Sequence, residues 1–484
     1  MNDNLKYNNS GFRKDFLWYT IGSLFPLMAG FLKTPVFTRH FSSESFGQLG
    51  LVGITFSFIG MLLFSWISSC LWRYYGTYKS SGKLKLLYSN LSFLFATSFI
   101  LLVLVSSTWY YSANSELIRE LVFYSFFFLV FNQLFMGYMV IVRLMGRASF
   151  YNLVLGLRTT AGFLVSLIFV FLLDFSITAL VSSLVLVDFI FVLYLFIRNP
   201  AKVKPSIRSV NKSGLRELLS YGFMGLILNL ALLSISYTDR YVIALFYDLD
   251  EVGIYDQVAK ISQLSIMSLI TIYFNTINPT LLSKLDKDFK SSLKMMESYI
   301  LGFVLIGLPL VFYLSLFAKE VSTLLLGEAF RKAYILMPFL FFATFLYGIA
   351  NFFELRLKFS HKIKKLMLIG LITALLNLIL NLYFIKAYGY HWAAYTTLIT
   401  YVFMLLFMLV NDPKVLMILW FRKRLLLQIS GLFLIQFFIY RIIINKLSLS
   451  VGLSIVLGII FATMYLIIFR RAILALNIPF SKQL

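Results

Sequence analysis

Residues 238–257 read TDRYVIALFYDLDEVGIYDQ, and they place several charged side chains between two long apolar runs. Asp239 and Arg240 stand side by side before a mostly apolar segment, and a turn that carries Asp250 then leads to Gly253. Such charges have different meanings in water and in lipid, because an ionisable side chain within a bilayer is costly and usually serves a function. The composition of the whole chain therefore decides how the stretch is interpreted.

The composition is that of an integral membrane protein. Of 484 residues, 60% are hydrophobic, 18% are aromatic and only 13% are charged, and the mean hydropathy is +0.87. Soluble proteins carry roughly twice that share of charged residues. The formal net charge of +23 would suit a nucleic-acid-binding protein if its basic residues covered a folded, water-facing surface. They lie instead in short loops between apolar runs, so no nucleic-acid partner is predicted.

Apolar runs long enough to cross a bilayer follow one another along the chain. A helix that spans the lipid needs about 20 such residues, because its backbone must satisfy its own hydrogen bonds there. We therefore expect an all-α polytopic membrane protein with about fourteen transmembrane helices, and counts of twelve or thirteen also fit the pattern. The expected spans are 16–38, 46–70, 87–108, 121–142, 151–173, 176–197, 218–238, 251–278, 298–318, 333–353, 366–385, 391–410, 425–444 and 450–469. The first run lacks a small-residue cleavage site and is interpreted as a retained helix, not a signal peptide.

The distribution of lysine and arginine predicts the orientation. About 31 of the 43 basic residues fall in every second loop and at both chain ends, whereas about 8 fall in the loops between them. Basic loops stay on the cytoplasmic side of a membrane, so both termini are expected in the cytoplasm. Topology thus accounts for most of the positive charge.

The two halves of the chain resemble each other. Sliding the sequence by 206 positions sets FSSESFGQLGLV (41–52) over YDLDEVGIYDQV (247–258), so that Glu44 coincides with Asp250 and a short glycine-containing turn recurs. A second similarity, at an offset of 214 positions, aligns two further short turns. Each half then holds six spans in one orientation, as in transporters that are built from parallel repeats.

This repeat predicts a domain organisation. We expect a six-helix lobe over 1–197, a cytoplasmic loop over 198–217 and a second six-helix lobe over 218–410. A pseudo-two-fold axis along the membrane normal would relate the lobes, with substrate sites between them. Residues 411–484 fall outside the repeat and are expected to form an extra helical hairpin and a cytoplasmic tail.

Two motifs resemble a known family. They are DRYVIALFYDLDEVGIYDQVAK (239–260) and NLILNLYFIKAYGYHWAAYTTLITYV (377–402). Their most specific residues are Asp239, Arg240, Gly253, Tyr255, Asn377, Asn381, Gly389, Ala393 and Ala394. The chain resembles the polysaccharide repeat-unit flippases of the O-antigen or capsule type, which belong to the multidrug, oligosaccharidyl-lipid and polysaccharide (MOP) exporter superfamily.

The resemblance implies a MATE-like fold, in which two six-helix lobes enclose a central cavity that opens alternately to either side. It also implies that undecaprenyl-diphosphate-linked oligosaccharide repeat units are flipped from the cytoplasmic to the outer face of the bacterial inner membrane. The flipped units would serve the synthesis of O-antigen, capsule or exopolysaccharide. Membrane lipid, a polysaccharide polymerase and chain-length proteins are then further expected partners.

Ionisable residues inside the expected spans or at their ends suggest where a site lies. They are Lys33, Arg158, Asp188, Asp239, Arg240, Asp256 and Lys260. Lys33 coincides with Asp239 under the offset of 206, so these two could pair across the cavity in one transport state. Alternatively, Lys33, Arg39 and Arg240 could form a cationic patch that binds a diphosphate. A third interpretation is that Asp239 and Arg240 extend to the outer interface and only anchor a helix end.

Arg158 and Asp188 lie at similar depths in adjacent spans, so an ion pair between them is expected. The pair is either structural, because pairing relieves the cost of a lone buried charge, or a proton-coupled switch beside the cavity. Asp256 and Lys260 are spaced as an i,i+4 pair and are interpreted as structural.

The candidate residues divide by proposed role. Lys33, Arg39, Arg158 and Arg240 are the candidates for substrate binding in a cationic cavity, and Asp188 and Asp239 are the candidates for coupling or gating. Asn377 and Asn381 are polar cavity candidates that either join helices or contact sugar hydroxyls.

The sequence contains no catalytic or cofactor-binding motif, so the chain is not expected to be an enzyme. Cys70 is the single cysteine, and His40, His361 and His391 are too scattered to suggest a metal site. Uphill transport would then depend on coupling to H⁺ or Na⁺ through a carboxylate, with help from the membrane potential for an anionic lipid.

Two other functions remain open. One is multidrug or other lipid export by a member of the same superfamily, although a cavity for cationic drugs should favour acids over basic residues. The other is an integral membrane polysaccharide polymerase or glycosyltransferase. Such an enzyme should carry a large outer loop with catalytic residues, whereas the longest outer loop expected here covers roughly 318–333.

Overall fold

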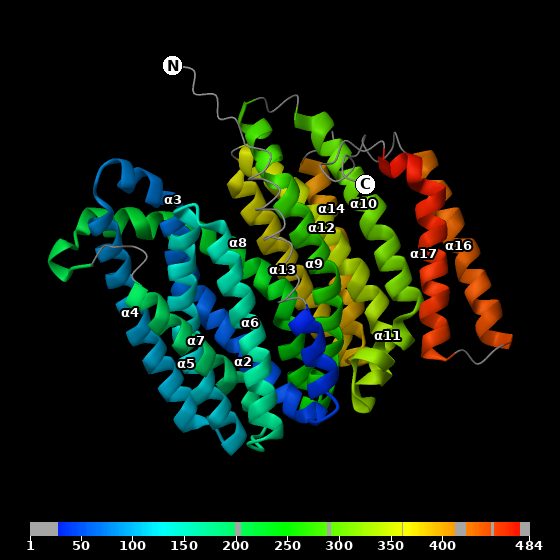
Figure 1. Ribbon diagram of the computed structural model, residues 1–484, viewed down its shortest axis with the longest axis horizontal. Coiled ribbons are helices and arrows are strands. Elements are labelled where there is room, and N and C mark those ends of the chain that lie inside the picture. Colours follow the sequence, from blue (N-terminus) through cyan, green and yellow to red (C-terminus); the bar gives the residue numbers. More distant parts are fainter. Residues whose placement is uncertain are drawn as a thin grey trace. The chain divides into compact units, whose positions relative to one another are not determined.

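The computed structural model describes residues 28–198, 205–287, 292–360, 362–411, 423–446 and 450–474. These residues are almost entirely helical, and no strand occurs among them (Figure 1). The all-α class expected from the long apolar runs is thereby confirmed.

The chain divides into two compact units. The first contains Ser45–Leu233, together with the described residues up to Lys33. The second combines Thr34–Glu44 with the described residues from Ser234 onward. The boundary falls inside one helix, α8 (Lys212–Phe246), which contributes its first part to one unit and its last part to the other. The lobe boundaries derived from the internal repeat stay a prediction.

The first unit consists of long helices joined by short turns. Its elements are α2 (Ser43–Gly60), η1 (Met61–Ser65), α3 (Trp66–Ser80), α4 (Leu84–Ser112), α5 (Glu116–Leu144), α6 (Ala148–Phe171), α7 (Ala179–Arg198), η2 (Ile207–Ser209) and the first part of α8. The π-helical turn η1 joins α2 to α3, so the span expected at 46–70 continues to Ser80. The extension is stabilised by packing, because Tyr75 is buried and the Tyr74 ring meets the Tyr221 ring edge-on at 5.6 Å.

Close packing fixes α8 against α3 in this unit. Gly222 lies so near Trp66 that a Cβ atom there would come within 2.7 Å of the indole. One turn earlier, the buried Cys70 thiol donates to the carbonyl oxygen of Leu218 at 3.2 Å. Helices in lipid gain little from hiding apolar surface and associate through such contacts instead.

The second unit holds the remaining helices. Its elements are the last part of α8, α9 (Leu249–Lys287), α10 (Ser292–Leu316), α11 (Ala318–Leu325), η3 (Glu328–Leu336), α12 (Met337–Phe359), α13 (Ile363–Tyr388), α14 (Trp392–Asn411), α16 (Lys423–Lys446) and α17 (Val451–Leu474). The outer segment expected as a loop at roughly 318–333 contains α11 and most of η3. Aromatic rings fill the interior, where Phe303 stacks on Phe345 at 5.4 Å and meets Phe352 edge-on at 6.0 Å. Each such pair adds about 0.5–1.5 kcal/mol beyond the area it buries.

Twelve helices among the described residues are long and apolar enough to cross a membrane. The other two of the fourteen expected spans are not among these twelve. One, at 251–278, is helical throughout within α9, although α9 is not among the twelve because it carries more polar residues. The other, at 16–38, lies mostly outside the described residues and is helical over 28–37.

The segment Thr34–Glu44 is bound tightly within the second unit. The Thr38 hydroxyl accepts a hydrogen bond from the Gly327 amide at 2.8 Å and donates one to the carbonyl of Thr34 at 2.6 Å. A Cβ atom on Gly327 would lie 1.9 Å from the Thr38 carbonyl oxygen, so glycine alone fits there. Side-chain contacts continue along the segment, because the Ser43 hydroxyl donates to the Asp250 carboxylate. The two turns that the internal repeat aligns are therefore in contact.

Candidate functional site

Asp239 and Arg240 lie at the centre of a buried charge cluster near the end of α8. Each is only 1% exposed. Arg240 Nη1 donates to Asp239 Oδ1 and to the carbonyl oxygen of Ser236, both at 2.7 Å. From α9, the Tyr255 hydroxyl donates to the other carboxylate oxygen of Asp239 at 2.6 Å. Both residues are thus engaged inside the protein, and the interpretation that they extend to the outer interface as a helix anchor is wrong.

Asp256 of α9 supplies a second carboxylate to the same cluster. Its Oδ1 lies 3.5 Å from Arg240 Nε, and its Oδ2 lies 2.6 Å from the Lys260 ammonium. The expected i,i+4 pair of Asp256 and Lys260 is confirmed. Two carboxylates and two cations therefore balance one another, as a buried charge cluster requires in a medium of low dielectric constant. Lys260 is the member that reaches outward, with its side chain 43% exposed.

The cluster leaves some hydrogen-bonding capacity unused. Arg240 Nη2 and Asp256 Oδ1 have no hydrogen-bond partner in the part of the chain that the structure describes, although both atoms are buried. The guanidinium lies over the rings of Tyr237 and Tyr255, at 5.4 and 4.9 Å from their centroids. Such contacts stabilise a desolvated cation, but they leave a donor and an acceptor available for rearrangement.

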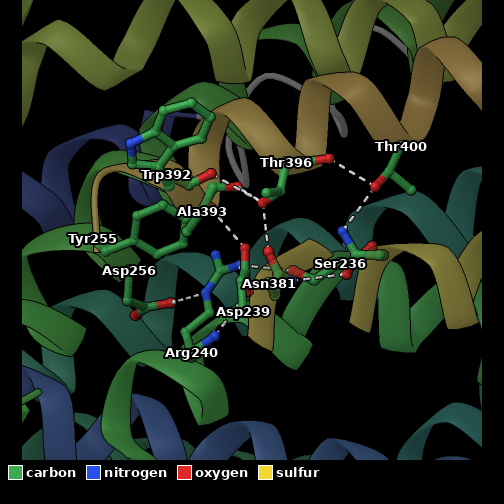
Figure 2. A network of polar contacts seen from close by, with 11 residues as sticks. Ser236, Asp239, Arg240, Tyr255, Asp256, Asn381, Trp392, Ala393, Thr396 and Thr400 are labelled. Atoms are coloured by element: carbon green, nitrogen blue, oxygen red, sulfur yellow. Dashed lines mark hydrogen bonds and ion pairs between the residues drawn. The ribbon is translucent and has the colours of Figure 1, made fainter. Parts of the chain in front are cut away.

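Asn377 and Asn381 belong to a second buried network, between α13 and α14. Asn381 Nδ2 donates to Asn377 Oδ1 at 3.0 Å, and Asn377 Nδ2 donates to the Thr400 hydroxyl, also at 3.0 Å. The Thr396 hydroxyl donates to Asn381 Oδ1. Figure 2 shows this network in one close view with the charge cluster. Hydrogen bonds of this kind join helices in lipid, which is one of the two roles expected for these asparagines.

Arg158 and Asp188 form the expected ion pair within the first unit. Arg158 of α6 donates through Nε to Oδ1 of Asp188 at 2.5 Å and through Nη2 to Oδ2 at 2.8 Å. Asp188 of α7 is fully buried, and the Arg158 guanidinium also lies 4.8 Å from the Phe135 ring centroid. The pair is therefore bidentate, which fixes the geometry of two helices as well as neutralising two charges.

The remaining basic candidates lie near the end of the first described helix. Lys33 is half-buried in the helix 28–37, and the structure groups it with the first unit, whereas Asp239 belongs to the second. Their pairing stays a prediction. Arg39 is exposed and donates through Nη2 to the carbonyl oxygen of Leu324 at 2.8 Å. Leu324 is in the last turn of α11, where a cation is favoured by the helix dipole.

Sequence reasoning missed three participants in these networks. Tyr255 was noted only as a motif residue, and Thr396 and Thr400 were not singled out. The signal for the threonines was their i,i+4 spacing on α14 opposite the i,i+4 asparagines of α13. Tyr255 gave no comparable signal, because a tyrosine in a membrane helix is more often interpreted as packing. Among the described residues, no three His, Cys, Asp or Glu side chains gather as metal ligands.

Comparison with known proteins adds the family. The family described as "Polysaccharide biosynthesis protein" matches residues 36–335, more than half of the chain. The chain belongs to this family. No match was found among curated protein sequences.

This polysaccharide biosynthesis protein also shares its fold with solved transporters. The lipid II flippase MurJ in an inward closed conformation is 17% identical, with a TM-score of 0.71 over 94% of this chain and 100% of that one. An inward-facing multidrug resistance MATE family transporter of the MOP superfamily is 16% identical, with a TM-score of 0.54 over 82% and 95% of the two chains. A MATE transporter variant from Vibrio cholerae is 15% identical, with a TM-score of 0.57 over 84% and 97%. At these identities the similarity shows the fold alone, and the MATE-like fold that was expected is confirmed.

Proposed function

We propose that this protein flips undecaprenyl-diphosphate-linked oligosaccharide repeat units from the cytoplasmic to the outer face of a bacterial inner membrane. The supporting observation is the family match over residues 36–335 in a chain whose fold is similar to that of a lipid II flippase over nearly its full length. The flipped units would feed the synthesis of O-antigen, capsule or exopolysaccharide. A polysaccharide polymerase and chain-length proteins would act on them next.

The substrate carries a diphosphate, so a cationic cavity should receive it. Lys33, Arg39, Arg158 and Arg240 are the proposed cations. Arg158 and Arg240 are neutralised by aspartates in this structure. If Asp188 or Asp239 takes up a proton or a Na⁺ ion, the neighbouring arginine loses that counter-charge, with Asp256 alone remaining beside Arg240, and can attract an anion. Binding of the coupling ion and binding of the diphosphate would then support each other, which is how coupling free energy arises.

Asn377 and Asn381 have a structural role in this proposal. Their amide groups are engaged with each other and with Thr396 and Thr400. We therefore assign them to joining α13 to α14 in the present state. Contact with sugar hydroxyls would require those hydrogen bonds to open in another state.

Export of cationic drugs is the second candidate, because MATE family transporters share the fold. A site for a cationic drug needs a carboxylate that is available to it. Asp188, Asp239 and Asp256 each have a cationic partner within 4 Å. The ion pairs thus favour an anionic substrate over a cationic one.

The test is transport in proteoliposomes. Purified full-length protein should move a fluorescent undecaprenyl-diphosphate-linked oligosaccharide across the bilayer, and Asp239→Asn and Lys33→Ala should each lower the rate at least tenfold. Asp174→Asn is the matched control, because Asp174 lies in an exposed turn with a φ of 53°, a conformation that asparagine also adopts readily. Movement of a cationic dye without movement of the lipid would overturn the proposal. Normal rates in both variants would remove these two residues from the site and leave the activity standing.

A further inference from the structure

The first three turns of α8 carry an exposed face that the transport proposal does not use. Lys212, Leu215, Arg216, Leu219, Ser220 and Phe223 border a shallow, open depression on the surface of this helix. Their spacing of three and four residues places them on one side of the helix. Lys212 and Arg216 are exposed cations at its beginning, and Phe223 is 64% exposed toward its other end. The face therefore changes from cationic to apolar along the helix axis.

Hydrogen bonds hold the start of α8 in one position. Asn90 of α4 accepts from the Asn211 amide at 3.1 Å and donates to the Asn211 side chain at 3.2 Å. Asn211 in turn accepts from the Gly214 amide at 3.0 Å, which caps the first turn. A Cβ atom on Gly214 would lie 2.4 Å from Asn90 Nδ2, so glycine is needed for this close approach. Because the Asn211 side chain occupies a backbone amide of the first turn, we expect a ligand to bind on the exposed face and not at the helix end.

The opposite side of this part of α8 packs against α3. Leu218 is buried and receives the Cys70 thiol at its carbonyl, and Gly222 packs on Trp66. Glu217, which follows Arg216 in the sequence, accepts a hydrogen bond from the Tyr78 hydroxyl of α3 at 3.3 Å. Its carboxylate thus lies toward α3, and in the part of the chain that the structure describes neither Lys212 nor Arg216 forms an ion pair, so their face is positively charged.

The length of the face matches one leaflet of a bilayer. From Lys212 to Phe223 the helix rises by about 17 Å at 1.5 Å per residue, and half of a hydrocarbon core is about 15 Å thick. Lys212 follows a strongly basic loop, which the distribution of charges assigns to the cytoplasmic side. If α8 crosses the leaflet along the membrane normal, the Lys212 ammonium and the Arg216 guanidinium would lie at the level of lipid headgroups, and Leu219 and Phe223 at the level of acyl chains.

We propose that this face binds an anionic phospholipid, with its phosphate on Lys212 and Arg216 and an acyl chain along Leu219 and Phe223. Charge complementarity selects the anionic headgroup. A phospholipid suits the face better than the transported lipid, because Ser220 is the single uncharged polar side chain among the six lining residues and offers little to a sugar. The site is a lipid-binding site outside the transport reaction, and it stands or falls independently of the proposed function.

The test measures lipid binding to the full-length protein in detergent by native mass spectrometry. Phosphatidylglycerol and phosphatidylcholine with the same acyl chains are titrated separately. Each basic residue near a membrane surface is worth about fivefold in affinity for an anionic lipid. Lys212→Gln/Arg216→Gln should therefore weaken phosphatidylglycerol by about 25-fold and leave phosphatidylcholine unchanged. Equal binding of phosphatidylglycerol by this variant and the wild type would overturn the proposal.

A matched control removes two other charges from the same side. Lys83→Gln/Lys85→Gln alters exposed lysines at the start of α4 and should change phosphatidylglycerol binding less than twofold. An equal loss of phosphatidylglycerol affinity in both double variants would show that binding depends only on the net charge of the protein, and would contradict the proposal. Thermal unfolding of each variant checks that it is folded.

Displacement experiments distinguish a bound phospholipid from other phosphate-containing ligands. Neither inorganic phosphate nor dihexanoyl phosphatidylglycerol should displace the long-chain lipid at millimolar concentration, because both lack the chain that rests on Leu219 and Phe223. Phe223→Ser should weaken both long-chain lipids by similar factors. Displacement by undecaprenyl diphosphate at lower concentration than by phosphatidylglycerol would assign the face to the transported lipid and overturn the proposal.

Discussion

Arg158 of α6 and Asp188 of α7 are joined at two points, Nε to Oδ1 at 2.5 Å and Nη2 to Oδ2 at 2.8 Å. Asp188 is completely buried, and the Arg158 side chain retains 13% exposure. Neither charge could remain at this depth alone without a large cost. The pair therefore sets the relative position of two helices, and any change in the charge of Asp188 must also affect the position of Arg158.

Removing one partner of this pair should cost more than removing both. Arg158→Met leaves a buried carboxylate without a counter-charge and should destabilise the protein by about 3–5 kcal/mol. Arg158→Met/Asp188→Leu replaces the pair with apolar side chains and should lose much less. Thermal unfolding in detergent measures both, and an equal loss in the two variants would show that the pair carries no buried-charge penalty.

The same double variant separates the two roles of the pair. A structural pair predicts near-normal flux in proteoliposomes once the protein is folded. A proton-coupled switch predicts that flux no longer responds to a pH gradient. The measurement is the initial rate of lipid-linked oligosaccharide movement with and without the gradient.

The hydroxyl of Tyr255 should contribute to holding the charge cluster together. Tyr255→Phe deletes the 2.6 Å donor to Asp239 and leaves one carboxylate oxygen buried without that bond. A loss of about 1–3 kcal/mol is expected for such a group. Tyr111→Phe is the control, because Tyr111 is 83% exposed at the end of α4. Equal unfolding temperatures for the two variants would contradict the assigned role.

Particular ion pairs show which contacts can be predicted from the sequence and which cannot. Arg158 and Asp188 could be paired in advance because two charges at one depth in neighbouring spans have few other partners in lipid. Asp256 and Lys260 could be paired from helix geometry alone. Asp239 and Arg240 could not, because adjacent residues on a helix do not face each other. Arg240 reaches Asp239 only by folding back toward the Ser236 carbonyl, a conformation that depends on the surrounding rings.

Contacts between distant segments account for the other differences. The outer segment near 318–333 was expected to be a loop, yet α11 ends against Arg39 and the next residues pack on Thr38. Nothing within the segment itself signals these partners, which come from nearly 290 residues away. The spans themselves were predictable because lipid imposes helix on any long apolar run.

The contact between Gly327 and Thr38 should be intolerant of any side chain. Gly327→Ala places a Cβ atom 1.9 Å from a backbone oxygen, which cannot move aside as a side chain could. We expect a loss of more than about 2 kcal/mol, as for other overpacked sites. Gly53→Ala is the control, because its Cβ atom would meet nothing within 4 Å, and alanine favours the helix by about 1 kcal/mol. If the unfolding temperature moved in the same direction for both variants, the close contact between Gly327 and Thr38 would not be what limits the side chain at residue 327.

His391 should make stability depend on pH. It lies in the turn between α13 and α14, and burial, followed by the nearby Lys332 charge, lowers its pKa from the ordinary value of 6.5, with Glu251 opposing. The unfolded chain then takes up the proton at higher pH than the folded protein, so stability should fall as the pH drops below about 6.5. His391→Gln should flatten the unfolding temperature between pH 7 and pH 5. An unchanged slope in His391→Gln would assign the effect to other groups.

The proposed orientation can be tested with single cysteines at the two ends of α4. The native Cys70 is fully buried, with its thiol bonded to the Leu218 carbonyl, so it should not react with a maleimide. Ser81 and Asn114 are exposed in consecutive turns, separated by a helix of 29 residues, which is about 43 Å long and exceeds the membrane core. With basic loops in the cytoplasm, Asn114→Cys should react with a membrane-impermeant maleimide in intact spheroplasts, and Ser81→Cys should react only after permeabilisation. The reverse pattern would contradict the proposed orientation and would place the cationic face at Lys212 in the outer leaflet.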